Sequence, residues 1–336
     1  MLTRHALLAL LACAAGAQPL QAQAAPSQQC AATAPGMRDA CQKGTDIFTM
    51  LMPQVLGALT GGGPVLGSAG SERGLSVGLR VTAIDGDLPT LASVPLSISR
   101  IVRSDIRTSR AAVPMPTLDF ALPLLPGFDV GAQRILSVDV LANVAYLPSR
   151  AIEDFSVRAT NGSLKLGWGA RVGLIADRLL MPAVSVSYFR RTLPTATFSA
   201  TLNTDGPLDA GVTPDSITLG ELSVRSDAIR LAASKRLGFL ELGGGIGEDS
   251  YRSFAQLRLR VNTTATQSLN AIYVVKQELK RRAAFGSAAL NLPRLRLAAE
   301  AGTTFGGDSV ATFNTFTDGR VNANRLFASV GARLRF

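Results

Sequence analysis

The chain of 336 residues has little histidine, few aromatic residues and no long apolar run after its first residues. Its one histidine, His5, lies in a segment with the features of a cleaved leader. The mature chain is therefore expected to contain no imidazole, which excludes Ser-His-Asp hydrolysis, His-assisted thiol catalysis and His-ligated metal sites. We expect a protein that is not an enzyme and that uses no cofactor and no metal.

Beyond the leader, no stretch reaches 18 uninterrupted apolar residues, so the sequence predicts no membrane-spanning helix. At 47% hydrophobic and 17% charged residues, the chain is too apolar to be disordered. A net charge of +10 would suit nucleic-acid binding. However, the arginines are spaced at two along strand-like runs, with no recognition helix or RNA-binding signature, so we expect no nucleic-acid partner.

Residues 1–24 have the pattern of a secretory signal peptide. A short basic start is followed by an apolar run over residues 6–17 and by a small-residue site at Ala22 and Ala24. Two alternatives stay open. The apolar run could serve as an anchor, although it has about half the roughly 20 residues that a spanning helix needs. Residues 10–13 resemble a lipoprotein cleavage box, which would make Cys13 the acylated first residue.

Residues 25–72 are predicted to form an N-terminal region with a disulfide loop, a short helix and a glycine-rich connection. Cys30 and Cys41 are the cysteines that remain after cleavage, and in an oxidising periplasm they predict one local disulfide worth roughly 2–3 kcal/mol. Metal binding is the weaker alternative, since two sulfurs supply half a zinc site. We expect the helix over Asp46–Leu59, either as a plug in a barrel lumen or packed on the barrel rim.

From Leu75 the apolar residues recur at every second position, which predicts β-strands with two different faces. Residues 73–336 are therefore predicted to be all-β. We expect a closed antiparallel transmembrane β-barrel of about 12 strands, within a range of 10 to 14, with the 9 to 11 residues each that a tilted membrane strand needs. A proline-rich region over residues 103–131 has no assignment. The predicted turns are Asp85-Gly86, Asn161-Gly162, Asp205-Gly206-Pro207, residues 235–238, residues 291–293 and Asp318-Gly319.

The last strand favours a membrane barrel over a soluble sheet. Phe336, Leu334 and the alternate residues back to Leu326 share one face, and the chain ends on an aromatic residue of that face. This stretch resembles the carboxy-terminal β-signal of Gram-negative outer-membrane β-barrel proteins, with Ser329, Gly331, Leu334 and Phe336 in the four signal positions. The resemblance implies the cell outer membrane as location and the outer-membrane assembly machinery as a partner. Lipid also forbids open strand edges, so such strands must close on themselves.

The arrangement of an N-terminal helix before a barrel of this size resembles the long-chain fatty acid transporter family, whose barrels carry an N-terminal plug. The short Asn-Pro-Ala plug motif of that family is absent from this sequence. The resemblance therefore implies an architecture and no substrate or site residue.

If the apolar faces meet lipid, the interleaved basic residues face the lumen. Only five of the 34 basic residues are lysines, and guanidinium groups suit carboxylate or phosphate recognition. The candidates are Arg80, Arg158, Lys165, Arg171, Arg191, Arg258, Arg260, Arg294, Arg296, Arg333 and Arg335. They predict a cationic lumen. The alternative is that they pair with interior carboxylates such as Asp139, Asp154 and Glu300, or meet lipid phosphates at the rim.

The sequence thus predicts a monomeric outer-membrane barrel in contact with membrane lipid and lipopolysaccharide. Few aromatic residues and a mean hydropathy of +0.23 point to a narrow or plugged interior. We expect a low-conductance channel or transporter for small anionic or amphiphilic solutes. The alternative is a non-transporting structural or surface-interaction barrel whose lumen is filled by side chains.

Overall fold

The computed structural model describes residues 24–60, 65–71, 74–91, 94–131, 133–147, 149–152, 155–178, 181–201, 215–262, 267–317 and 319–336. The predicted leader, with Cys13, lies outside these residues. The N-terminal elements are α2 (Gln28–Ala31), η1 (Pro35–Met37) and α3 (Arg38–Thr60). The strands are β1 (Ser76–Pro89), β2 (Asp105–Leu125), β3 (Phe128–Val130), β4 (Gln133–Tyr146), β5 (Arg150–Ile152), β6 (Phe155–Ala159), β7 (Leu164–Ile175), β8 (Ala183–Thr192), β9 (Ala196–Thr201), β10 (Ser216–Leu237), β11 (Leu240–Asn262), β12 (Ser268–Asn291), β13 (Leu295–Phe305), β14 (Thr315–Thr317) and β15 (Arg325–Arg335).

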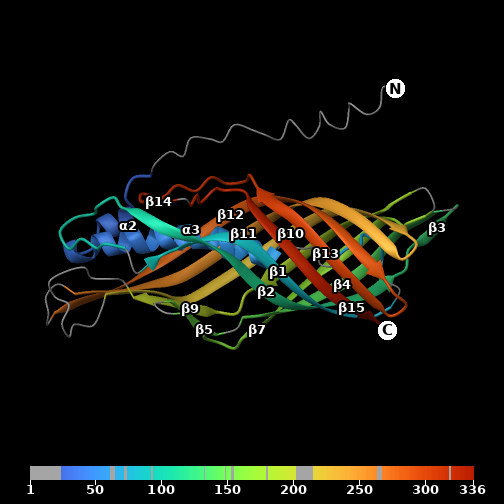
Figure 1. Cartoon of the computed structure of the whole chain (residues 1–336), viewed down its shortest axis with the longest axis horizontal. Coiled ribbons are helices and arrows are strands. Elements are labelled where there is room, and N and C mark those ends of the chain that lie inside the picture. Colours follow the sequence, from blue (N-terminus) through green and yellow to red (C-terminus); the bar gives the residue numbers. More distant parts are fainter. Residues whose placement is uncertain are drawn as a thin grey trace, which may run out of the picture.

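The strands form one large ring that surrounds α3 (Figure 1). The hydrogen-bonded order runs β11-β12-β13-β15-β1-β2-β4-β7-β8-β10, and β10 also pairs with β11, so the path of pairings returns to its start. All these pairings are antiparallel. The short strands β9, β6 and β5 extend one end of β10, beyond a bulge between Gly220 and Ser223. The predicted all-β barrel-like fold is confirmed.

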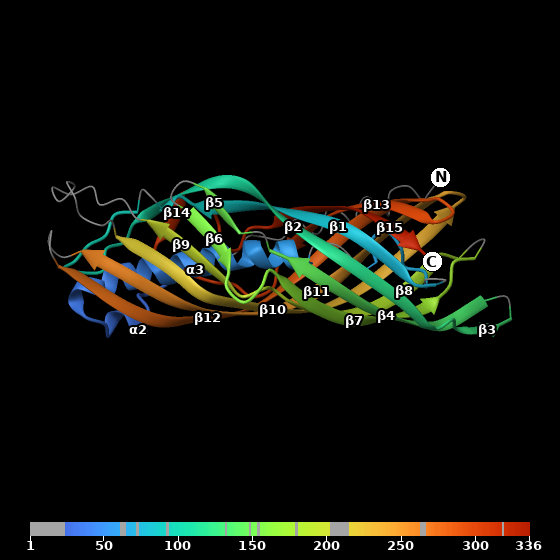
Figure 2. The same ribbon diagram turned by 90° about the horizontal axis from the view of Figure 1, so that it is seen from below.

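The predicted strand number of 10 to 14 is wrong, because the sheet of the described residues has 15 strands. Ten of them make the ring, and the surplus consists of short strands at its ends. Four ring strands are also much longer than a membrane strand needs, since β2, β10, β11 and β12 have 21, 22, 23 and 24 residues. These strands are about twice as long as the 9 to 11 residues expected for a membrane strand, and they make the ring an elongated one (Figure 2).

Two predicted turns are wrong. Asp85 and Gly86 lie inside β1, where they pair with Ala112 and Ala111 of β2. Asn161-Gly162 joins β6 to β7, but β6 pairs with β9 while β7 pairs with β4 and β8, so the dipeptide connects strands that are not neighbours. The turns near residues 235–238 and 291–293 are confirmed, since they connect β10 to β11 and β12 to β13. Residues 205–207 and Asp318 lie outside the described residues.

The N-terminal disulfide is confirmed between Cys30 and Cys41, with an S–S length of 2.04 Å. The helix is longer than predicted, because α3 begins at Arg38 and not at Asp46. Its first turn holds Asp39, which is favourable at the positive end of a helix and pairs with Lys43 one turn later. The helix lies inside the ring, so the packing on the barrel rim that the sequence left open is not what the structure has (Figure 2).

The N-terminal segment runs through the ring from one end to the other. Ala24 donates its backbone N–H to Thr312 O in the connection between β13 and β15, and Thr33 Oγ1 donates to the Tyr273 hydroxyl near the start of β12. These contacts lie at the end with the longer loops. The same segment leads into β1 at the opposite end of the ring, where the first residue of β1, Ser76, pairs with Arg335, the last residue of β15. We call these two ends the loop end and the hairpin end.

Candidate functional site

The outer face of the ring is apolar near the hairpin end. The alternation predicted for the last strand is confirmed: Leu326, Val330, Leu334 and Phe336 are exposed on the outside, while Ser329 and Arg333 are buried inside. Exposed outward apolar residues also occur on the other ring strands in this half, and they include Leu79, Leu118, Val140, Leu166, Val186, Leu231, Leu242, Leu290 and Leu297. We call this surface the apolar belt.

On β11 the chemistry of the two faces is exchanged along the strand. Near the hairpin end Leu242 and Ile246 face outward, and Glu241 and Asp249 face inward. Toward the loop end the inward positions become apolar, with Leu257 and its alternate neighbours buried against α3, while the outward positions become polar. The strand keeps its period of two, but what lies on each side changes.

The same exchange occurs on the neighbouring strands. On β10 the outward residues change from Ile229 and Leu231 to Asp227 and Arg225, while the inward residues change from Arg230 to Val224. On β12 the outward residues change from Leu290 to Arg282, Lys280 and Glu278, while the inward residues become Leu279 and Val275. On β1 the first outward charge is Asp85, beside the inward Ile84. The exchange therefore marks a boundary around this side of the ring.

The height of the belt fits a bilayer. Along β1, β10 and β12 and the turns beside them, the apolar belt spans ten residues from the hairpin end to the first outward charge beyond it. These spans run from Leu75 to Asp85, from Leu237 to Asp227 and from Leu292 to Arg282. Ten residues of a strand rise about 33 Å, and a tilt of about 40° reduces this to about 25 Å along the barrel axis. A membrane barrel has an outward apolar band about 25 Å tall.

Inside the ring, five arginines of the wall are paired with carboxylates. Arg80 Nε lies 2.7 Å from Asp119 Oδ2, and Arg171 Nη2 lies 2.5 Å from Asp139 Oδ2. Arg230 with Asp249, Arg296 with Glu241 and Arg325 with Asp87 make further pairs at 2.9, 2.8 and 2.6 Å. All ten side chains are at most 10% exposed. The prediction of paired interior arginines is therefore confirmed for Arg171 with Asp139, whereas Asp154 lies outside the described residues.

The candidate cationic residues divide into three groups by position. Arg80, Arg171, Arg191, Arg296 and Arg333 are buried inside the ring, and Lys165 and Arg335 are half-buried on inward positions. The prediction is wrong for Arg258 and Arg260, which face outward because Leu257, Leu259 and Val261 occupy the inward positions against α3. It is also wrong for Arg158, exposed on β6 outside the ring, and for Arg294, exposed in the turn before β13.

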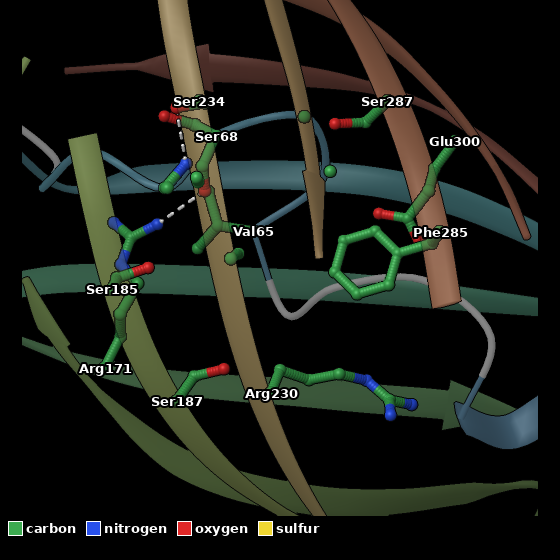
Figure 3. Close-up of a pocket in the computed structure, with 15 residues that line it drawn as sticks. Val65, Ser68, Arg171, Ser185, Ser187, Arg230, Ser234, Phe285, Ser287 and Glu300 are labelled. Carbon is green, nitrogen blue, oxygen red and sulfur yellow. Dashed lines mark hydrogen bonds between the residues drawn. The ribbon is translucent and has the colours of Figure 1, made fainter. Parts of the chain in front are cut away.

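Residues 65–71 pass through the lumen against these arginines (Figure 3). Arg296 Nη2 donates to Gly67 O at 2.5 Å, and Arg171 Nη1 donates to Ser68 O at 3.1 Å. The Ala69 N–H donates to Ser234 Oγ at 2.9 Å, and Ser71 Oγ donates to Asp139 Oδ1 at 2.7 Å. The wall thus binds both the backbone and the side chains of the segment.

The space left beside this segment is small. A cavity of about 20 Å³ is lined by Ser68, Arg230, Phe285 and Glu300, among other residues (Figure 3). A second cavity of about 10 Å³ lies between Leu66, Arg80 and Arg333. A volume of this size holds about one water molecule. In the part of the lumen that these residues line, the chain itself fills the interior.

Toward the loop end the interior is an apolar core built on α3. Ile47, Phe48, Met52 and Leu56 of the helix pack with inward residues of β1, β2, β10 and β11 in one buried cluster. Gly57 is a close approach, because a Cβ there would lie 2.1 Å from Ile84 Cδ1. We call this half of the ring, beyond the apolar belt, the projecting mouth. Its interior is apolar and its exterior is mostly polar, as in a water-soluble domain, although Ile272 and Val274 of β12 are exposed on the outside.

Buried polar residues of α3 attach the helix to the loops, a role that the sequence pattern did not indicate. Asp39 accepts the backbone N–H groups of Ser97 and Val102, at 2.8 and 2.9 Å. Asp46 accepts the backbone N–H and the side-chain amide of Asn314, at 2.8 and 2.7 Å. Burial raises the pKa of the Asp46 carboxyl above its usual value, and these hydrogen bonds oppose the rise only in part.

The carboxy-terminal residues of the predicted assembly signal lie where a lipid-facing strand end requires them. Phe336 is 76% exposed and Leu334 is also exposed, both on the outer face, whereas Ser329 is buried and shares a hydrogen bond with Thr82. Gly331 approaches Leu79 O, which leaves little space for a Cβ. Their recognition by the assembly machinery stays a prediction.

The described residues contain neither a membrane-spanning helix nor a metal-binding group. No helix among them is long and apolar enough to cross a membrane. No group of three or more histidine, cysteine or acidic residues in the described ranges has an arrangement that could hold a metal ion.

No protein-family model and no curated protein matches the sequence. Among solved structures, the attachment invasion locus protein Ail of Yersinia pestis, crystallised with the heparin analogue sucrose octasulfate, is 11% identical over 78% of this chain and 99% of its own, with a TM-score of 0.28. A Pseudomonas aeruginosa FadL homologue is 12% identical over 79% of this chain and 91% of its own, with a TM-score of 0.27. OccK9 (OpdG) of the same organism covers 78% of this chain and 98% of its own at 11% identity and a TM-score of 0.19. Likenesses this distant transfer no functional residue.

Proposed function

We propose that this chain is a monomeric, closed transmembrane β-barrel of the outer membrane with a filled lumen, and that its function is exerted by the parts that project from the cell surface. The observation that carries the proposal is the exchange of polar and apolar faces along β1, β10, β11 and β12. Strands with an apolar exterior for about 25 Å and a polar exterior beyond it fit a wall that leaves the membrane.

The orientation follows from the connections. Outer-membrane barrels have short periplasmic turns and longer extracellular loops. At the hairpin end, β10 and β11 are joined by residues 238–239, and β12 and β13 by residues 292–294. At the loop end, the connections 90–104 and 306–324 are much longer, although the second contains β14. We therefore assign the hairpin end to the periplasm and the projecting mouth to the outside of the cell.

A filled lumen favours surface interaction over transport. Arg80, Arg171, Arg230 and Arg296 of the lumen wall pair with carboxylates, and residues 65–71 lie against Arg171 and Arg296. The test is conductance of the purified full-length chain in planar bilayers, with folding verified by heat-modifiable migration on gels. We expect no stable channels. Reproducible single-channel steps from the folded wild-type protein would overturn the filled-lumen proposal.

The second candidate function is a gated channel, in which the N-terminal segment withdraws and frees a cationic path for small anions. It is favoured by the polar attachment of residues 67–69, because hydrogen bonds to arginines are exchangeable for bonds to water. A cross-link between α3 and β11 separates the two functions. A Cβ at Gly44 would lie 3.3 Å from Leu257 Cγ, so the pair Gly44→Cys and Leu257→Cys is close enough to be bridged. A gated channel would conduct only after reduction of this bridge, with wild type under the same reductant as control.

A further inference from the structure

The outward face of β10, β11 and β12 carries a cluster of basic side chains just beyond the apolar belt. Arg225, Arg252, Lys276, Lys280 and Arg282 all face outward and are exposed. The three strands are hydrogen-bonded neighbours, and in their register Arg225 lies opposite Arg252, Ser250 opposite Lys280, and Glu248 opposite Arg282. We call these five residues the basic patch.

Acidic residues neutralise only part of this patch. Glu248 and Glu278 share its face, and Asp308 accepts the backbone N–H of Lys280 at 2.9 Å. Five basic and three acidic residues leave a net charge of +2. The pair of Arg282 with Glu248 is long, at 3.9 Å, and both side chains are more than half exposed, so it adds little stability and leaves Arg282 available to another anion.

Elsewhere along the same boundary the outward charges are balanced. On β1 and β2, Asp85 faces Arg110 at 3.6 Å. On β10, Asp227 lies next to the basic patch, opposite Ser250, and pairs with Arg190 of β8 at 2.6 Å, so this pair adds no net charge. On β13 and β15, the corresponding outward pair is Thr303 with Leu326, which carries no charge. These three pairs therefore add no net charge at the boundary, in contrast to the basic patch.

The basic patch begins at the level of the headgroup layer of the outer leaflet. Arg282 is the first outward charge beyond the belt on β12, and Lys276 lies six residues further, which is about 15 Å along the axis of a tilted strand. The headgroup region adds roughly 5–7 Å on each side of the hydrocarbon core. The patch therefore begins within this layer and extends outward from it.

We infer that the basic patch binds the phosphate groups of lipopolysaccharide in the outer leaflet. Phosphate oxygens accept charge-assisted hydrogen bonds from guanidinium and ammonium groups, which are stronger than bonds between neutral groups. The acyl chains of the same molecule would lie on the apolar belt directly beneath the patch. The inference rests on the proposed outer-membrane orientation, and it assigns a ligand class and a site to one face of the wall.

The test compares lipid A binding by folded protein in detergent, measured by native mass spectrometry. The patch variant is Arg225→Gln, Arg252→Gln, Lys280→Gln and Arg282→Gln. The control is Arg258→Gln with Arg260→Gln, which removes two outward arginines of the same β11 face further from the belt. We expect the patch variant to bind bis-phosphorylated lipid A about tenfold more weakly, since several charge-assisted bonds are lost, and the control to bind as wild type. Wild type should lose the same affinity when the lipid A phosphates are removed.

Each other outcome overturns the inference. Equal binding by the patch variant and wild type would show that these side chains do not hold the phosphates. Equal affinity for lipid A with and without its phosphates would show that the apolar belt, and not the patch, binds the lipid. An equal loss of lipid A affinity in the control variant would mean general electrostatic attraction. Preferential binding of soluble heparin over lipid A at the patch would show that the patch binds a soluble polyanion. Because binding in detergent does not depend on membrane orientation, these results are separate from a failure of the proposed function, which surface labelling would reveal.

Discussion

At the scale of single residues, several interior arginines of the ring are held in place by specific carboxylates. Arg80 and Asp119 show the arrangement: they lie on adjacent strands, make two hydrogen bonds at 2.7 and 3.2 Å, and are both nearly inaccessible to solvent. A buried charge that loses its partner is strongly unfavourable, whereas exchange of both partners for apolar groups is often tolerated. The pairs therefore fill the lumen and fix the register of the wall.

We predict that Arg80→Met and Asp119→Leu each lower the free energy of unfolding by about 3–5 kcal/mol, because each leaves an uncompensated buried charge. The double variant should recover most of this loss. Urea unfolding in detergent micelles, followed by heat-modifiable gel migration, measures all four proteins. Additive losses in the double variant would contradict a direct pair.

Asp46 gives a second prediction at this scale, on pH dependence. Because burial raises its pKa in the folded protein, its protonated form is favoured by folding. Its contribution to stability is therefore present in full below the usual carboxyl pKa and is lost as the pH rises through the raised value. Asp46→Asn should remove this dependence. Lowering the pH from neutral to acidic should therefore raise the Tm of wild type relative to the Tm of the variant. A constant Tm difference between pH 7 and pH 4 would contradict it.

At the scale of elements, each strand of the long wall has two environments. The alternation that starts at Leu75 predicted β1, and the alternation back from Phe336 predicted β15, whose inward and outward residues are those expected. The same rule failed for Arg258 and Arg260, because periodicity tells which residues share a face but not what that face contacts. Past the belt, water lies outside and α3 inside, so the apolar residues of β11 point inward there.

The strand β2 could not be assigned from the sequence because of its prolines. Pro114 and Pro116 lie opposite Ala83 and Val81 of β1, but β2 pairs with β4 only from Thr117 onward. These two prolines therefore occupy a stretch where one edge of β2 lacks the β4 partner, and a missing N–H is tolerated there; Pro123 lies opposite Asp139 of β4, at a register shift. This depends on where the neighbouring strand ends, which the sequence of β2 does not contain. The carboxylate partners of the arginines depend on cross-strand register in the same way.

The exchange of environments predicts opposite results for one substitution at two positions of the same strand face. Ala288 and Val274 are both exposed on the outside of β12, the first within the belt and the second beyond it. Ala288→Lys should cost about 2–4 kcal/mol of folding free energy in lipid, because lysine would face hydrocarbon. Val274→Lys should change the stability by less than about 0.5 kcal/mol. Unfolding in phosphatidylcholine vesicles gives both values, and equal costs would contradict the assigned boundary.

At the scale of the whole molecule, the ring encloses its own N-terminal segment, which runs from Ala24 at the loop end to β1 at the hairpin end. Its three sections have different attachments. Buried carboxylates hold the start of α3 to the loops, an apolar cluster holds the helix within the projecting mouth, and arginines of the wall bind residues 67–68 within the belt. If the loop end lies outside the cell, the N-terminal end of the described chain is displayed at the surface.

Accessibility labelling of intact cells tests this account most directly. Three positions suffice: an epitope inserted between Ala25 and Pro26, Arg100→Cys in the connection after β1, and Arg294→Cys in the turn before β13, the last two on exposed residues. The native cysteines are buried in their disulfide and do not react. We predict that antibody and an impermeant maleimide reach the epitope and Arg100→Cys in intact cells and reach Arg294→Cys only after the outer membrane is permeabilised. Labelling of Arg294→Cys alone in intact cells would contradict the orientation, and labelling of Arg100→Cys without the epitope would contradict the passage of the N-terminal segment through the ring.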